Sequence, residues 1–431
     1  MRPPQGELLA GRHAHGGTMT RPTVEPARGV VPGAGEDAAA GAIGRSTNGR
    51  RVRGSAAARV LLVAGEASGD LHAADLVVAL RALLPGVEVV GIGGPRLREV
   101  GMRTIADAAD VATVGLVEGI GRLGILARAY RSLSRILRRE RPDLAIFVDF
   151  PEFNLRLARV AKAVGVPVFY YIGPQVWAWR RGRIRTVARR VDALAVVFPF
   201  EPPLYASQDL GVEFVGHPLL DRVRATRSRA DSLRAYGLDP GRLTVALLPG
   251  SRTKEIRYVL PRLLHAARIL HRERDCQFVL ALASTVDRDE IETRVRGCGV
   301  DVRLVADDTY NVIHAADVAL VTSGTATLET ALLERPMVIV YRLSPVTYAL
   351  ARLLVGVSFI GIPNIVAGRQ IVPEFVQGAA TGPRIAAAAG AILDDRCARE
   401  RMVRELAGVR AVLGPPGAAA RAADIAHRLL L

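Results

Sequence analysis

The stretch TVALLPGSRTKEIRY, residues 244–258, decides the fold class of this chain. Its first five residues form a short apolar run with β-branched members, and a Pro-Gly pair ends that run. Ser251 is suited to cap a helix that follows, and Glu255 stands near the start of a helical pattern. The order is therefore strand, tight turn and helix.

Arg252 lies in this turn. A turn between a strand and a helix leaves backbone N–H groups unpaired at a helix N-terminus, where the helix dipole also favours negative charge. The planar guanidinium of an arginine matches two phosphate oxygens at once. Two interpretations follow: a phosphate-binding turn, or an ordinary turn with a solvated arginine.

The same pattern occurs near the beginning of the chain. The apolar run RVLLVA, residues 59–64, is followed by GEASGD, residues 65–70, and then by a helical pattern that ends near residue 83. The glycine spacing is not that of a dinucleotide-binding turn. Further strands alternate with helices in both halves, which predicts an α/β fold with parallel sheets.

The chain divides into five predicted parts. Residues 1–55 are rich in Gly, Pro, Ala and Arg and lack the apolar core of a signal peptide, so we expect a disordered extension or a misassigned start. We predict a first Rossmann-like domain over residues 56–222, a polar linker over 223–242 and a second Rossmann-like domain over 243–382, with the two domains facing a cleft. Helices are predicted for residues 383–431.

Composition excludes several classes of protein. The net charge is +16 and is carried almost wholly by arginine, which favours contact with phosphates, anionic lipid or nucleic acid. The three cysteines are widely spaced, which argues against a disulfide scaffold and against a zinc site. No apolar run is long enough to span a bilayer, so we expect a cytoplasmic protein.

Candidate site residues of the first half follow its strands. Asp149 ends the strand 144–148 within VDFPEFN, where a carboxylate is a candidate general base; the alternative is an aspartate that caps the next helix. Both tryptophans of the chain fall in the loop after the strand 166–171, and we expect Trp177 to line a pocket. The acceptor side of the cleft is predicted to include these residues: Glu66, Ser68, Gly69, Asp70 and Trp177.

A second anion site is predicted in the second half, at TSGTATLE, residues 322–329. Small and hydroxyl-bearing residues at a helix N-terminus offer N–H and O–H donors to an anion. Glu329 lies about one turn inside that helix, where its carboxylate can accept hydrogen bonds from a ribose diol.

An amphipathic, arginine-rich stretch covers residues 115–139. Such a helix can lie on an anionic membrane surface, or it can be a core helix with a solvated face. We assign its less charged beginning to lipid or acyl contact: Leu116, Val117, Ile120, Leu123 and Leu126.

Taken together, the motifs resemble one family. AGEASGD, VDFPEFN, the P-x-V-W-A-W loop, FPFE, GHP, LLPGSR, TSGTATLE and PNIVAGR stand in the order and spacing of the lipid-A-disaccharide synthase family, over roughly residues 58–430. The resemblance implies the two-domain GT-B glycosyltransferase fold. It also implies a hexosyltransferase of lipid A (lipopolysaccharide) biosynthesis in a Gram-negative bacterium.

The resemblance implies a reaction and its groups. A diacylglucosamine passes from UDP to the 6-hydroxyl of a diacylglucosamine 1-phosphate, which gives UDP and a β-1,6 disaccharide. Asp149 would take the acceptor proton, and UDP and the donor sugar would contact Arg252, Ser323, Gly324, Thr325, Glu329, Asn364 and Arg369. Neither a metal nor a cofactor is implied. The partners would be the two lipid substrates and the cytoplasmic face of the inner membrane, with peripheral attachment; whether the chain forms a homodimer stays open.

Two further hypotheses remain. Another GT-B enzyme that uses UDP-N-acetylglucosamine, a transferase or a 2-epimerase, has the same fold, but the order of the motifs disfavours it. A nucleic-acid-binding protein would fit the charge, yet the aromatic residues are not interleaved with the basic runs. Direct displacement needs one base, whereas a retaining reaction would also need a carboxylate nucleophile, and Glu66, Asp70 and Glu152 leave that open.

Overall fold

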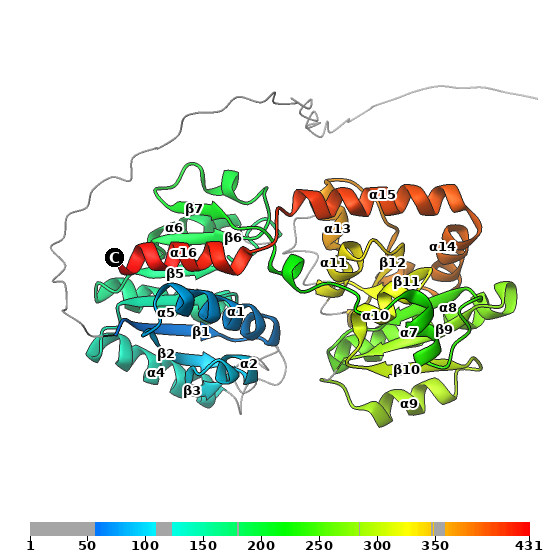
Figure 1. The fold of residues 1–431 in the computed structure, drawn as a ribbon, viewed down its shortest axis with the longest axis horizontal. Helices are drawn as coiled ribbons and strands as arrows, with labels where there is room; N and C mark the ends of the chain where they lie inside the picture. Colours follow the sequence, from blue (N-terminus) through cyan, green and yellow to red (C-terminus); the bar gives the residue numbers. More distant parts are fainter. Residues whose placement is uncertain (1–56, 109–122, 179–180, 284, 346–347, 349–357) are drawn as a thin grey trace, which may run out of the picture. The chain divides into compact units, whose positions relative to one another are not determined.

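The computed structural model describes residues 57–108, 123–178, 181–283, 285–345, 348 and 358–431. Within these ranges the chain forms two parallel sheets with helices on both faces (Figure 1), which confirms the predicted α/β class. The predicted N-terminal extension lies outside the described residues.

The first sheet has the strand order β3-β2-β1-β4-β5-β6-β7. Its strands, in chain order, are β1 (Arg59–Ala64), β2 (Glu88–Gly93), β3 (Arg103–Asp107), β4 (Leu144–Val148), β5 (Val168–Tyr171), β6 (Ala193–Val196) and β7 (Gly211–Phe214). The helices of this half are α1 (Ala67–Leu83), α2 (Pro95–Glu99), α4 (Leu123–Arg139), α5 (Pro151–Ala163) and α6 (Ile184–Arg190), with the 3-10 turns η1 (Arg181–Arg183), η2 (Pro202–Tyr205) and η3 (Pro218–Asp221).

The second sheet has the strand order β10-β9-β8-β11-β12-β13. Its strands are β8 (Thr244–Leu248), β9 (Gln277–Leu282), β10 (Val302–Ala306), β11 (Val318–Thr322), β12 (Met337–Tyr341) and β13 (Glu374–Val376). The accompanying helices are α7 (Arg229–Ala235), α8 (Thr253–Arg274), α9 (Arg288–Arg296), α10 (Thr309–Ala315), α11 (Thr325–Leu332), α13 (Ile362–Ala367), α14 (Gly382–Asp394) and α15 (Arg396–Val412), with the 3-10 turn η4 (Gln377–Ala379). The chain ends with α16 (Ala418–Leu430).

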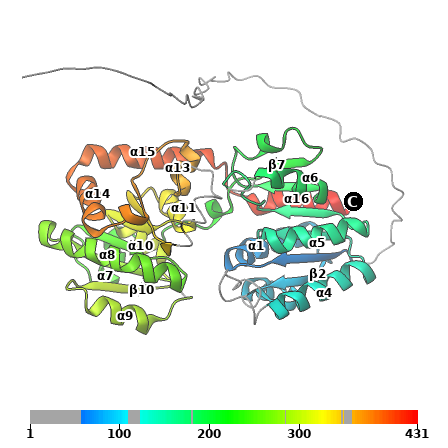
Figure 2. The same cartoon turned by 180° about the vertical axis from the view of Figure 1, so that it is seen from behind.

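The central strands of each sheet are apolar and are buried on both faces, whereas the edge strands are partly exposed. In β1, Val60 and Leu62 pack against α1 and α16, whereas Leu61 and Val63 pack against α4 and α5. Figures 1 and 2 show these two layers from opposite sides. Fully buried parallel strands read as continuous hydrophobic runs rather than alternating ones, and this is the pattern that the sequence displays.

The last helix, α16, returns to the first sheet. It packs along α1, and its alanine-rich face is buried in the same cluster as β1 and β4. Arg421 Nε donates to the main-chain oxygen of Val215 at 2.9 Å, and the Gly417 amide donates to Asp221 at 2.7 Å. The sequence predicted helices after residue 383 but not that one of them completes the first half.

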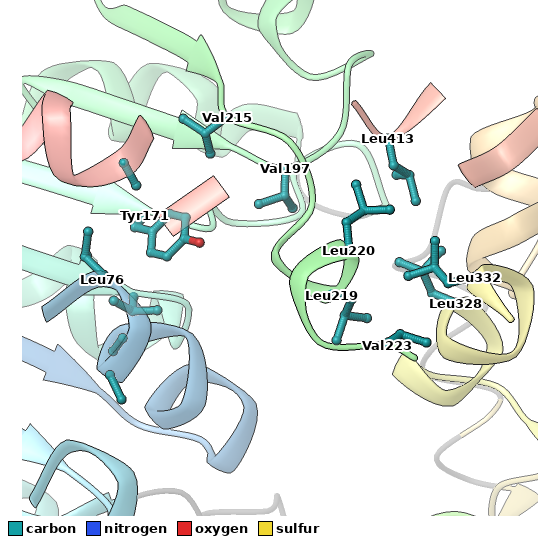
Figure 3. Packing of buried hydrophobic residues seen from close by; sticks show 14 of the residues in the cluster. Leu76, Tyr171, Val197, Val215, Leu219, Leu220, Val223, Leu328, Leu332 and Leu413 are labelled. Carbon is teal, nitrogen blue, oxygen red and sulfur yellow. The ribbon is translucent and has the colours of Figure 1, made fainter. Parts of the chain in front are cut away.

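A buried segment lies between the two sheets along the chain. Leu219 and Leu220 of η3, together with Val223, belong to the hydrophobic cluster that also contains Leu328 and Leu413 (Figure 3). Part of the stretch after β7 is therefore core.

The docking of α16 leads to a stability prediction. Ile425 is 2% exposed on α16, so Ile425→Ala should lower the free energy of unfolding by about 2–4 kcal/mol through lost contacts and a cavity. Asp424→Ala changes an exposed neighbour on the same helix and should stay within about 0.5 kcal/mol of the parent. Chemical denaturation of both variants measures the difference, and equal midpoints would contradict the docking of α16.

Candidate functional site

The turns after β1 and β4 lie side by side. The two strands pair in parallel with Ala64 opposite Val148, so their carboxyl ends reach the same edge of the sheet. Gly65 follows the first strand, and a Cβ there would lie 2.5 Å from the ring of Phe150 in the other turn. A side chain at residue 65 would therefore displace Phe150, which explains the glycine.

Asp149 sits in a strained turn between β4 and α5. Asp149 and Phe150 both have positive φ, 48° and 50°, although neither is glycine. Each such residue costs on the order of 1–3 kcal/mol and persists only where its surroundings enforce it. The N-cap of α5 is Phe150 and no side chain caps the helix, so the geometry does not favour the alternative in which Asp149 is a capping residue.

Asp149 has an unusual protonation equilibrium. Burial, and next the charge of Glu66, raise the pKa of its carboxyl from 3.8 to about 6, although the Phe150 amide and the Arg252 guanidinium oppose this rise. A carboxylate with a pKa near 6 is ionised at neutral pH and is a stronger base than an ordinary aspartate. These properties are those of a general base.

Arg252 follows β8 in the second sheet and meets residues of the first. Its guanidinium lies 3.7 Å from Glu66 and 3.2 Å from Glu255, and 69% of its side chain is exposed. Three predicted site residues from distant parts of the sequence, Glu66, Asp149 and Arg252, are thus brought together. Arg252 itself is the N-cap residue of α8 and no side chain caps that helix, so the expected cap by Ser251 is wrong.

The start of α11 lies beside the Arg252 turn, because β8 and β11 pair in parallel with Leu248 opposite Val321. Gly324 is exposed with φ 147°, Thr325 is also exposed, and the Ser323 hydroxyl donates to the Ile360 carbonyl at 2.8 Å. No side chain caps α11. An anion could therefore meet amide donors at residues 324 and 325, while the Ser323 hydroxyl is already engaged.

Glu329 lies one turn into α11 and receives a hydrogen bond from Tyr310 of α10 at 3.2 Å. Burial raises the pKa of the Glu329 carboxyl, and the Tyr310 hydroxyl counteracts this effect. One carboxylate oxygen is therefore fixed by the protein. Tyr310 was not among the sequence candidates, since nothing local in the sequence pairs it with Glu329.

Two residues that were predicted to contact the UDP-sugar donor, Asn364 and Arg369, have protein partners instead. The Asn364 side chain is fully buried; it donates to Val372 and Glu374 at 2.9 and 2.7 Å and accepts from the amides of Ile371 and Val372. In this arrangement its amide shapes the loop after α13 rather than facing a ligand. The Arg369 side chain is 59% exposed and pairs with Glu405 of α15.

The predicted acceptor residues of α1 separate into two kinds. Asp70 is 2% exposed and accepts hydrogen bonds from the amides of Gly94, Arg96 and Leu97 at 2.6, 3.0 and 3.3 Å. It therefore holds the start of α2, a role the sequence did not predict. Ser68 is exposed, whereas Gly69 is buried against Val148.

Trp177 belongs to an aromatic cluster. Its ring meets Phe198 and Phe200 edge to face, with centroids 5.9 and 5.5 Å away, and these two phenylalanines stack on each other. Glu201 is buried and accepts from the amides of Val197 and Phe198, which holds this loop in place. Burial raises the pKa of the Glu201 carboxyl to about 7.

Most of the predicted acyl-contact residues lie outside the described residues: Leu116, Val117 and Ile120, together with the side chain of Leu123. Leu126 is half-buried against the core of the first sheet. Leu133 and Leu137 of α4 are fully buried, so the described part of α4 is a core helix with a basic outer face. Among the described helices none is both long and apolar enough to cross a bilayer.

Comparison with known proteins decides the family. A family model described as lipid-A-disaccharide synthetase matches residues 60–411. A lipid-A-disaccharide synthase of Geobacter sulfurreducens is 48% identical over 374 residues, which is 86% of this chain and 97% of the relative. A second, from Syntrophus aciditrophicus, is 50% identical over 375 residues, again 86% of this chain and 97% of the relative.

The chain belongs to the lipid-A-disaccharide synthase family. It is a hexosyltransferase that forms the lipid A disaccharide, as the order of its motifs predicted. The crystal structure of Acinetobacter baumannii MurG aligns with a TM-score of 0.54 at 15% identity, over 86% of this chain and all of that one. This likeness shows the GT-B fold alone, and the alternative of another UDP-sugar enzyme is not favoured.

Within this synthase, sequence reasoning missed two residues beside Asp149. Asn154 donates to the main-chain oxygen of Asp149 at 2.7 Å, and the Tyr170 hydroxyl donates to the same oxygen at 2.6 Å. Asn154 is the last residue of the VDFPEFN motif, and its place in that motif is the sequence feature that could have indicated it. In the sequence, Tyr170 is indistinguishable from any other residue of a buried strand.

The position of Asp70 predicts a structural phenotype. Asp70→Asn keeps one acceptor oxygen but turns an NH₂ group toward a backbone amide, which should lower stability by about 1–3 kcal/mol. The specific activity of folded enzyme should stay near that of the parent. Val78→Ala, a change at an exposed position of the same helix, should alter neither property. Thermal unfolding and steady-state kinetics check both variants, and a kinetic loss without loss of stability would place Asp70 in contact with the acceptor.

Proposed function

We propose that the synthase joins UDP-2,3-diacylglucosamine to 2,3-diacylglucosamine 1-phosphate by direct displacement, with Asp149 as the base. The observation that carries the proposal is the meeting of Asp149, Glu66 and Arg252 at the ends of strands from two sheets. In open parallel sheets, ligands bind beyond the carboxyl ends of the strands where the strand order reverses. These residues occupy that position.

The proposed reaction has one chemical step. The Asp149 carboxylate accepts the proton of the acceptor 6-hydroxyl while the oxygen attacks the anomeric carbon of the donor. The bond from that carbon to the UDP oxygen breaks, and the configuration inverts to give a β-linked disaccharide. Negative charge grows on the leaving diphosphate, where Arg252 and the amides at the start of α11 can stabilise it.

The donor's UDP is proposed to lie on the second sheet. Arg252 would contact the diphosphate together with the amides of Gly324 and Thr325, and Glu329 would accept from the ribose. Ser323 would have to release the Ile360 carbonyl before its hydroxyl could donate to the diphosphate. The Tyr310 hydroxyl holds one Glu329 oxygen, and among the described residues no hydrogen bond engages the other one, which supports the ribose contact. Asn364 is proposed to support the loop rather than touch the donor, and Arg369 would need to leave Glu405 to reach it.

A second carboxylate near the reacting carbon would permit a retaining reaction instead. Glu66 is the candidate, since its charge reaches Asp149. Its pairing with Arg252 at 3.7 Å favours another task, which is to orient the guanidinium before the donor binds. The stereochemistry of the product separates the two mechanisms.

The enzyme is also proposed to work at the cytoplasmic face of the inner membrane, because both substrates are lipids. The outer face of α4 carries exposed arginines at residues 128, 131, 135, 138 and 139, and a basic face of this kind attracts anionic lipid. Its buried face holds the helix on the first sheet.

The experiment that tests the proposed reaction is mass spectrometry of the products from UDP-diacylglucosamine and the 1-phosphate acceptor. The parent enzyme should form disaccharide 1-phosphate and UDP. Asp149→Asn should lower kcat by about 10²–10⁴-fold while UDP affinity stays near that of the parent. Arg252→Ala should weaken UDP binding as well, which makes it the control for a donor-side defect. Parent-like kcat in a folded Asp149→Asn enzyme would exclude Asp149 as the base.

The ionisation of Asp149 should make both the activity and the stability of the enzyme depend on pH. The base must be ionised in the free enzyme, so kcat/KM should rise with pH through about 6 and then level off. Because the folded pKa is above the unfolded value, ionisation of Asp149 makes the fold less stable as pH rises through about 6. Asp149→Asn should therefore be as stable as the parent at neutral pH, or more stable by on the order of 1–3 kcal/mol. A helix-capping aspartate would give the opposite change in melting temperature.

Membrane attachment can be tested by charge removal. Replacing Arg131, Arg135 and Arg138 with glutamine should reduce sedimentation with vesicles that contain anionic phospholipid, and the loss should be greater at low salt. The variant with glutamine at Arg288, Arg294 and Arg296 on α9 is a matched control for loss of charge. Equal sedimentation of the two variants would remove α4 from the proposed contact.

A further inference from the structure

The strained turn at Asp149 is held at one atom, the main-chain oxygen of residue 149. Asn154 Nδ2 approaches it at 2.7 Å and the Tyr170 hydroxyl at 2.6 Å. Asn154 comes from the first turn of α5, and Tyr170 comes from β5, the strand next to β4. Both side chains are fully buried, so neither donor has water as an alternative partner.

These donors fix the turn from two independent elements. Asn154 Nδ2 also lies 3.2 Å from the Val148 oxygen, which ties the end of β4 to the start of α5. On the other side, the Phe150 ring stacks on Phe153 with centroids 5.4 Å apart, and Gly65 leaves it room. Two consecutive left-handed residues have few conformations available, so fixing the oxygen between them fixes the direction in which the Asp149 Cα–Cβ bond leaves the main chain.

We propose that Asn154 and Tyr170 are positioning residues for the reaction: by donating to the Asp149 main-chain oxygen they hold the Asp149 carboxylate toward the acceptor hydroxyl. The inference rests on the proposed role of Asp149 as the base. Neither residue touches substrate or the reacting atoms. Their effect is on the geometry of proton transfer, where a displacement of about 1 Å can lower the rate about 10²-fold.

The variant that isolates this effect is Tyr170→Phe, because it removes one hydroxyl and keeps the ring in the core. Tyr171→Phe is the matched control. Tyr171 is the next residue of β5, is equally buried on the opposite face of the sheet, and its hydroxyl has no hydrogen-bond partner among the described residues. Both variants therefore lose a buried tyrosine hydroxyl from this strand, but only Tyr170→Phe also loses the hydrogen bond to Asp149.

The test measures kcat and KM for Tyr170→Phe and Tyr171→Phe, each alone and combined with Asp149→Asn. Tyr170→Phe should lower kcat by about 10- to 100-fold with both KM values within about twofold of the parent, and Tyr171→Phe should leave kcat within about twofold. In the Asp149→Asn background, Tyr170→Phe should have no further effect, since no base remains to be oriented.

Three results would overturn the inference. The first is parent-like kcat in folded Tyr170→Phe, and the second is an equal loss in Tyr171→Phe. The third is an undiminished loss when Tyr170→Phe is added to Asp149→Asn, which would show that Tyr170 acts elsewhere. Asn154→Ala supplies a second removal of a donor, and it should also lower kcat without a comparable change in KM. Normal kcat in Asp149→Asn itself would instead refute the base, so failure of the proposed mechanism is recognised separately.

Discussion

The parallel pairing of two central strands in each sheet is the constraint on which the site depends. β1 pairs with β4 in one sheet, and β8 pairs with β11 in the other. At each pair the strand order reverses, since β2 and β9 continue on one side while β5 and β12 continue on the other. The helices that follow the two strands diverge there, and the ends of the strands stay uncovered by a connection. Asp149 and Arg252 both stand at such ends.

The turn at Asp149 is short as well as strained. β4 ends at Val148 and α5 begins at Pro151, so the chain passes from the strand to the helix within two residues. Two left-handed residues achieve this, and hydrogen bonds from Asn154 and Tyr170 offset part of the strain. The result is a carboxylate that is partly withdrawn from water, and a raised pKa follows. Stability and basicity are opposed at this residue.

The GT-B fold by itself does not specify the reaction, which is proposed to depend on the residues in the turns after β4 and β8. The GT-B fold of this chain aligns with Acinetobacter baumannii MurG at 15% identity, so the sheets tolerate very different sequences. The proposed site consists of residues at the strand ends, which the fold alone does not specify. The packing of the first sheet also depends on the end of the chain. The C-terminal helix α16 covers an apolar face formed by β1, β4 and α1.

The sequence by itself determined the fold class, the family and the residues that stand at strand ends, because hydrophobic period and turn composition are local signals. It could not determine which side chains those residues meet. Asp70 caps α2 through amides that begin 24 residues later, Asn364 turns inward to its own loop, and Tyr310 reaches Glu329 from another helix. Each of these pairings arises only when separate elements pack together. Local sequence patterns do not indicate which residues from other elements will be in contact.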